Sequence, residues 1–148
     1  MSRKQMIILV ADDDEDDRLL MQDAVDEGNL AIALHFVENG EELLDYLYRR
    51  EQYSDVARSP LPDLILLDLN MPKKDGRETL AEIKANSDFR QIPVVILTTS
   101  KTAEDIHRSY KSGGNSFITK PVSFEGLVEV MKTLGEYWFD VVELPQKN

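Results

Sequence analysis

The chain contains no cysteine, few cations for its number of acids, and no long apolar run. Without cysteine, neither a disulfide nor a thiolate metal site can form. Lys and Arg number 17 against 28 Asp and Glu, for a formal net charge of -11, and nucleic-acid or anionic-membrane surfaces need clustered cations instead. Because the N-terminus also shows no signal-peptide pattern, we expect a cytoplasmic protein with no nucleic-acid or membrane partner.

The length of 148 residues suits one domain with a proper core. We expect that domain to span 1–148, with its core over about 6–137 and a C-terminal extension over 138–148. No repeat or low-complexity segment divides the chain. All six prolines lie between the periodic segments and therefore mark the boundaries of the elements.

The hydrophobic pattern predicts five strands that alternate strictly with five helices. Such alternation specifies a parallel sheet between layers of helices, and right-handed crossovers favour a doubly wound topology. The predicted fold class is therefore α/β, a flavodoxin-like (βα)5 sandwich with strand order 2-1-3-4-5. The expected strands span 6–11, 31–37, 63–68, 93–98 and 116–119, and the expected helices span about 16–27, 41–51, 76–86, 102–112 and 123–137.

Acidic residues follow two of the predicted strands. Asp12, Asp13 and Asp14 come directly after the first strand, and Asp68 ends the third. Parallel strands of such a sheet bring their carboxyl ends to one edge, where the fold places its site. Acids that meet there repel each other unless a cation joins them. We therefore expect a hard divalent cation such as Mg²⁺ at this edge.

Plain structural explanations stand beside this interpretation. Asp68 taken alone can simply terminate its strand, and acids at a helix start are common without any ligand. The second explanation suits Asp16 and Asp17, which lie at the positive end of the following helix. It suits Asp12 and Asp13 less well, because they precede the point where the helix can begin.

Two further polar residues come at strand ends. Thr98 closes the fourth strand, and Lys120 follows the fifth. Each is ordinary alone, since Thr is a normal strand residue and Lys normally lies at the surface. Together with the acids, a hydroxyl and an ammonium give this edge both metal and anion functions. Asn70, in the loop after Asp68, leaves its backbone carbonyl free to face a metal.

Five motifs lie at these strand ends and in the loops beside them: Leu-Val-Ala-Asp-Asp-Asp (9–14), Leu-Leu-Asp-Leu-Asn-Met-Pro (66–72), Asp-Gly (75–76), Pro-Val-Val-Ile-Leu-Thr-Thr-Ser (93–100) and Phe-Ile-Thr-Lys-Pro (117–121). Together they resemble the receiver domains of two-component response regulators of the CheY type, over about residues 6–137. The long loop before the third strand and the segment 109–121 are similar to the single-domain regulators of cyanobacterial phytochromes. The predicted strand order belongs in part to this resemblance.

The resemblance implies a phosphoacceptor and a set of metal ligands. Asp68 would take a phosphoryl group from a histidine kinase, with a phytochrome as a candidate kinase. Asp13 and Asp68, with the backbone carbonyl of Asn70, would hold Mg²⁺ directly, and Asp12 would reach it through water. Asp14 would share this role if the register shifted by one residue.

The resemblance also implies a switch. Lys120 would pair with the phosphoryl oxygens, and Thr98 would donate a hydrogen bond to one of them. Phe117 occupies the aromatic switch position, so that it would turn inward as Thr98 moves. The face made by the fourth helix, the fifth strand and the fifth helix would change for a partner. The Lys120–Pro121 peptide bond would be cis.

The segment 136–144 is unusually apolar for a chain end. We expect it either to be the last turn of the fifth helix folding back on its own domain, or to extend the switch face into a homodimer contact.

Three functions compete on these residues. A phosphorylated signalling receiver is the first, with no enzyme activity beyond self-phosphorylation from small phosphodonors and autodephosphorylation. A Mg²⁺-dependent phosphohydrolase of the haloacid-dehalogenase kind would need an Asp two residues after the nucleophile, where this chain has Asn70. A phosphorylation-independent binding module usually lacks one of the acids, the Thr or the Lys, and all of them are present here.

Overall fold

The computed structural model describes residues 5–145. Five parallel strands form one sheet in the order β2-β1-β3-β4-β5, which confirms the predicted flavodoxin-like topology. The strands are β1 (Met6–Ala11), β2 (Ile32–Val37), β3 (Leu64–Leu67), β4 (Val94–Thr98) and β5 (Ser116–Thr119). The helices are α1 (Glu15–Glu27), α2 (Gly40–Tyr48), α3 (Gly76–Ala85), α4 (Ala103–Lys111) and α5 (Phe124–Gly135), with a 3-10 helix at Glu51–Tyr53 and a π-helix at Glu136–Val141. Over the described part of the chain, no helix is long and apolar enough to span a membrane.

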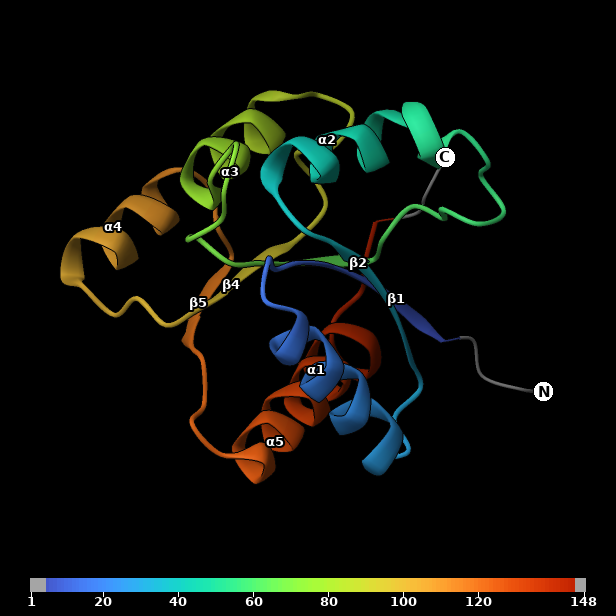
Figure 1. Ribbon diagram of the computed structural model, residues 1–148, viewed down its shortest axis with the longest axis vertical. Helices are drawn as coiled ribbons and strands as arrows, with labels where there is room; N and C mark the ends of the chain where they lie inside the picture. The colour runs from blue at the N-terminus through green and yellow to red at the C-terminus, as the bar shows by residue number, and fades with distance from the viewer. Residues whose placement is uncertain (1–4, 146–148) are drawn as a thin grey trace.

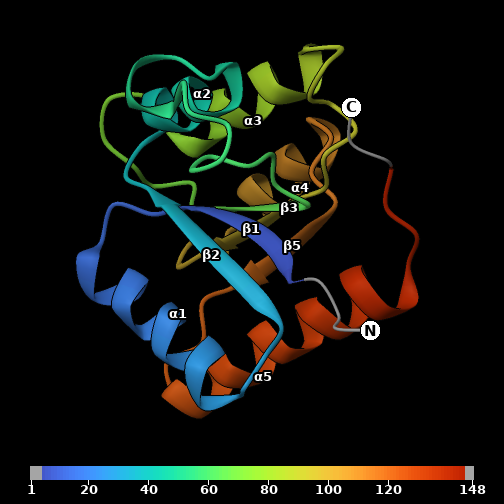
Figure 2. The same ribbon diagram turned by 90° about the vertical axis from the view of Figure 1, so that its right-hand side faces the viewer.

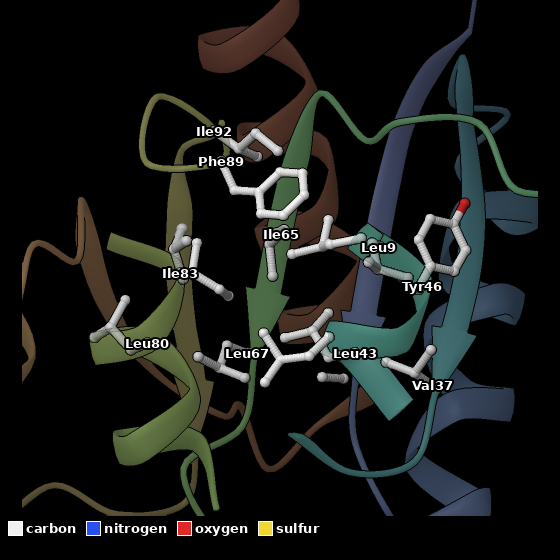
Figure 3. Packing of buried hydrophobic residues seen from close by; sticks show 14 of the residues in the cluster. Leu9, Val37, Leu43, Tyr46, Ile65, Leu67, Leu80, Ile83, Phe89 and Ile92 are labelled. Atoms are coloured by element: carbon white, nitrogen blue, oxygen red, sulfur yellow. The ribbon is translucent and has the colours of Figure 1, made fainter. Parts of the chain in front are cut away.

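Helices cover both faces of the sheet (Figure 1). α2, α3 and α4 lie on one side and α1 and α5 lie side by side on the other, as the turned view in Figure 2 also shows. Each layer buries apolar side chains against the sheet, because a helix with one apolar face must remove that face from water. Figure 3 shows the cluster beneath α2 and α3, in which Leu43 and Leu80 lie with Leu67 of β3.

All four residues of β3 are buried, and they alternate between the two clusters. Ile65 and Leu67 belong to the cluster under α2 and α3, whereas Leu64 and Leu66 belong to the cluster under α1 and α5. Burial on both faces explains the uninterrupted apolar run, and each such side chain stabilises the fold by about 1.5–3 kcal/mol. The strand therefore gives Asp68, which follows it, a fixed position.

The second helix is shorter than predicted. The pattern indicates a helix over 41–51, but α2 ends at Tyr48 because Arg49 takes a left-handed conformation, with φ of 57°. The chain then forms a separate 3-10 turn at Glu51–Tyr53 before the long loop. Hydrophobic periodicity does not predict this end of the helix, since the end depends on the backbone conformation of a single residue, Arg49.

The apolar C-terminal segment continues α5 as a π-helix. Trp138 and Phe139 pack against the cluster under α1 and α5, in agreement with a segment that folds back on its own domain. Tyr137 and Val141 remain exposed, at 50% and 70% of their full area. The π-helix therefore has one face that packs on the domain and another that is exposed.

Candidate functional site

The carboxyl ends of β1 and β3 place two buried acids beside each other. Asp12 is 1% exposed and Asp68 is 7% exposed. Their backbones extend the sheet ladder, because Asp12 N donates to Val37 O and Asp68 N donates to Ala11 O, each at 3.0 Å. Ladder hydrogen bonds hold both carboxyl groups at the sheet edge where the sequence predicts the site.

Asp13 completes an acidic group with these two residues. One carboxylate oxygen from each of Asp12, Asp13 and Asp68 lies within 4.8 Å of the others. Three carboxylates this close repel each other, and oxygen donors of this kind suit a hard divalent cation. The three side chains thus come together as the sequence predicts.

Asp14 has a different role in the structure. It is the N-cap of α1, and its Oδ1 accepts hydrogen bonds from the backbone N–H groups of Asp16 and Asp17 at 2.9 and 3.2 Å. Its own N–H donates to Asp12 Oδ1 at 2.9 Å. An N-cap of this kind contributes about 1 kcal/mol to helix stability. The carboxylate of Asp14 therefore caps α1, whereas the acidic group is formed by Asp12, Asp13 and Asp68.

Lys120 lies among three carboxylates. Its Nζ is 2.7 Å from Asp12 Oδ2, 2.7 Å from Asp17 Oδ2 and 3.2 Å from Asp68 Oδ2. Burial alone would lower the pKa of Lys120, but the hydrogen bonds to Asp12 and Asp17 and the charge of Asp68 hold that pKa above its ordinary value. The lysine is therefore a fixed positive charge at the end of β5.

One oxygen of Asp12 has the ammonium of Lys120 as its single polar neighbour among the described residues. Burial raises the pKa of Asp12, and the ammonium of Lys120 and the N–H of Asp14 only partly offset this rise. Asp12 Oδ2 lies 2.7 Å from Lys120 Nζ as an ion pair, and no other described residue within 5–145 gives this oxygen a hydrogen bond. A buried carboxylate oxygen in this condition costs free energy, which a bound cation would relieve.

Thr98 and Asn70 contact the other oxygen of Asp68. The buried hydroxyl of Thr98 donates to Asp68 Oδ1 at 2.8 Å, and the backbone N–H of Asn70 donates to the same atom at 3.1 Å. Phe117 lies on β5 beside the cluster under α2 and α3, where it is partly buried. The structure thus brings Thr98 directly to the proposed phosphoacceptor and places Phe117 on the adjoining strand.

The prediction of a cis Lys120–Pro121 bond is wrong, because this bond is trans. The trans form of an X-Pro bond is favoured by roughly 0.5–1 kcal/mol unless the surroundings select the cis form. Here the Lys120 N–H donates to Thr98 O at 2.8 Å, and its ammonium reaches Asp12 with the trans bond in place. The local hydrogen bonds therefore supply no reason for the cis form.

An ion pair next to the site joins α3 to α4. Arg77 Nε and Nη2 donate to the two carboxylate oxygens of Asp105, each at 2.8 Å, and the Ser100 hydroxyl donates to Asp105 Oδ2 at 2.5 Å. The hydrogen bonds from Arg77 and Ser100 hold the pKa of Asp105 well below its ordinary value. The pair ties the loop after Thr98 to α3.

Sequence reasoning did not find the roles of Asp17, Arg77 and Asp105. It assigned Asp17 to the helix dipole. In the structure Thr102 is the N-cap of α4, because Asp105 N donates to Thr102 Oγ1 at 3.1 Å, and the Asp105 carboxylate accepts from Arg77 and Ser100. The missed contacts join residues far apart in the chain, such as Asp17 and Lys120. The position of α1 over the sheet decides that contact, and no local spacing encodes it.

Comparison with known proteins identifies the family. The family model of the response regulator receiver domain matches residues 8–132 of this sequence. The chain is 38% identical over 144 residues to the response regulator Rcp1 of Synechocystis sp., covering 97% of this chain and 96% of Rcp1. The phosphorylated cyanobacterial phytochrome response regulator RcpA superposes with a TM-score of 0.87 at 38% identity, over 96% of this chain and 99% of RcpA. The Mn²⁺-bound form of Rcp1 gives a TM-score of 0.84 at 38% identity, over 95% and 99% of the two chains. This chain therefore belongs to the response regulator receiver domains of two-component signalling.

Proposed function

We propose that Asp68 accepts a phosphoryl group from a histidine kinase and that the chain signals through the resulting change of its surface. The observation that carries this proposal is the pairing of the buried Asp68 carboxylate with a hydroxyl and an ammonium. Thr98 Oγ1 lies 2.8 Å from Asp68 Oδ1, and Lys120 Nζ lies 3.2 Å from Asp68 Oδ2. Both groups can donate to the oxygens of a phosphoryl group attached there.

In the transfer, an oxygen of Asp68 attacks phosphorus, and the bond from phosphorus to the kinase histidine nitrogen breaks. The nitrogen keeps the electron pair of that bond. Lys120 neutralises negative charge on the phosphoryl oxygens. Asp13, Asp68 and the backbone carbonyl of Asn70 would hold Mg²⁺, with Asp12 reaching it through water. Bound Mg²⁺ would supply further neutralisation of the transferring group.

The switch starts from the hydrogen bond of Thr98. After transfer, its hydroxyl donates to a phosphoryl oxygen, and Phe117 turns into the space that Thr98 leaves. The partial burial of Phe117 next to a packed cluster supports this step. The face made by α4, β5 and α5 then differs between the two states, which is how a local charge change reaches a partner.

We also propose the partners of this face. The kinase is a histidine kinase, and a phytochrome is the candidate because RcpA is named as a phytochrome response regulator. A homodimer would use α4, β5, α5 and the C-terminal segment, where Tyr110, Val122 and Tyr137 are exposed. In this proposal the whole of 1–148 is one receiver domain in the cytoplasm. Its own chemistry is limited to self-phosphorylation from small phosphodonors and autodephosphorylation.

The test is the intact mass after incubation with acetyl phosphate, with and without Mg²⁺. We expect one phosphoryl increment that requires Mg²⁺ and is absent in Asp68→Asn. Asp63→Asn, which removes an acid before β3 instead of after it, is the matched control and should still be labelled. The proposal is wrong if the folded wild-type protein neither gains this mass nor binds beryllofluoride, which mimics an aspartyl phosphate.

A further inference from the structure

Lys120 has one carboxylate partner outside the acidic group of Asp12, Asp13 and Asp68. Asp17, in the first turn of α1, places its Oδ2 2.7 Å from Lys120 Nζ, although 103 positions separate the two residues in the chain. The side chains of Lys120 and Asp17 are 12% and 34% exposed. The contact is therefore a partly buried ion pair that joins α1 to the end of β5.

The other two partners of Lys120 are acids that a divalent cation would also use. The Lys120 ammonium lies within 3.2 Å of a carboxylate oxygen from each of three acids, which is as many as its three N–H donors can serve. A cation held by Asp12 and Asp68 would compete with the ammonium for the same oxygens. Asp17 is the one acceptor of the three that lies outside this competition.

We propose that Asp17 is a positioning residue that holds the Lys120 ammonium beside the acidic group and thereby leaves Asp12 and Asp68 free for a divalent cation. The inference rests on the proposed function, because it takes this group to be the metal site. Without Asp17, the remaining partners of the ammonium are Asp12 and Asp68. Lys120 would then hold these two carboxylates more closely and oppose binding of the cation.

A double-mutant cycle separates this effect from the simple loss of a negative charge. Mg²⁺ affinity is measured by NMR titration for the wild type, Asp17→Asn, Lys120→Gln and the double variant. We expect Asp17→Asn to weaken binding roughly threefold or more when Lys120 is present. In the Lys120→Gln background the same change should have little effect, because no ammonium is left to compete.

Two single variants complete the test. Asp16→Asn removes the same charge from the same turn of α1, but the Asp16 side chain is exposed, so we expect a smaller loss of affinity. Asp17→Glu keeps a carboxylate within reach of Lys120 and should restore most of the binding. Equal effects of Asp17→Asn in both backgrounds would overturn the proposal.

A measurement without metal keeps this inference separate from the proposed metal site. The ¹⁵N signal of the Lys120 ammonium, identified by its loss in Lys120→Gln, should move in Asp17→Asn and stay in place in Asp16→Asn. If that signal does not move, the inference fails even when the wild type binds Mg²⁺. If the signal moves but the wild type does not bind Mg²⁺, the metal assignment fails and with it the part assigned to Asp17 in cation binding.

Discussion

At the scale of single residues, Asp68 is notable for having a different partner on each of its two oxygens. Thr98 and the backbone of Asn70 contact Oδ1, and Lys120 contacts Oδ2. These contacts place a donor group at both oxygens of the carboxylate that would act as the nucleophile. They also fix the orientation of the carboxylate. In the proposed function, Lys120 serves the phosphoryl transfer and Thr98 serves the switch that follows it.

Replacement of Thr98 separates these two functions. In Thr98→Ala, Asp68 keeps Lys120, so we expect labelling by acetyl phosphate to persist at a rate within about tenfold of the wild type. The hydroxyl that would report the phosphoryl group is lost. Beryllofluoride should then produce much smaller amide shifts over α4, β5 and α5 in NMR spectra.

Thr99→Ala is the matched control for this experiment, because Thr99 is the neighbouring residue and is exposed. It should respond to beryllofluoride as the wild type does. Shifts of wild-type size in Thr98→Ala would show that the switch does not pass through the Thr98 hydroxyl.

At the scale of elements, the pair of Arg77 and Asp105 links α3 and α4 across the loop that follows Thr98. The Ser100 hydroxyl, in this loop, donates to the same Asp105 carboxylate. The pair therefore opposes movement of the loop in the resting state.

The pair gives a pH dependence with a defined sign. The pKa of Asp105 is depressed in the folded state by Arg77 and Ser100. Its stabilisation is therefore present above the unfolded pKa of about 3.9 and is lost as the pH falls through the lower folded value. We expect Asp105→Asn to lower the free energy of unfolding by about 1 kcal/mol at pH 7 and by less at low pH.

Urea unfolding at pH 7 and near pH 3 measures this difference. Asp88→Asn is a suitable control, because Asp88 is an exposed acid in the turn that follows α3. A loss in Asp105→Asn that is the same at both pH values would contradict the assignment of the stability to this ion pair.

The elements were the most predictable part of the molecule. Each of the ten predicted strands and helices is present, because two-sided burial produces continuous apolar strands and one-sided burial produces periodic helices. That the acids, Thr98 and Lys120 meet at one sheet edge followed from the parallel topology, whereas their individual roles came from the family resemblance. Contacts such as Asp17 with Lys120 or Arg77 with Asp105 could not be predicted, since they depend on the placement of whole helices.

At the scale of the whole molecule, the net charge of -11 and the buried acids at the sheet edge act in the same direction. Both make the metal-free protein less stable through repulsion between like charges. A divalent cation at the acidic group would relieve part of that repulsion, and the receiver fold would then be coupled to the metal concentration.

Thermal unfolding with and without Mg²⁺ tests this coupling. At a concentration of one hundred times its dissociation constant, a ligand stabilises the folded state by about 2.7 kcal/mol. We expect Mg²⁺ to raise the melting temperature of the wild type and of Asp23→Asn, which removes an exposed acid of α1. In Asp13→Asn most of this increase should be lost. An equal increase in all three proteins would assign the effect to general screening of charge.

The central claim is that phosphorylation occurs on Asp68. Its most direct test is reduction of the acetyl-phosphate-treated protein with borohydride, which converts an aspartyl phosphate to homoserine, followed by peptide mass spectrometry. The account predicts homoserine at position 68 alone, and none without Mg²⁺. Homoserine at position 12 or 13, or no conversion in a protein whose intact mass shows the label, would contradict it.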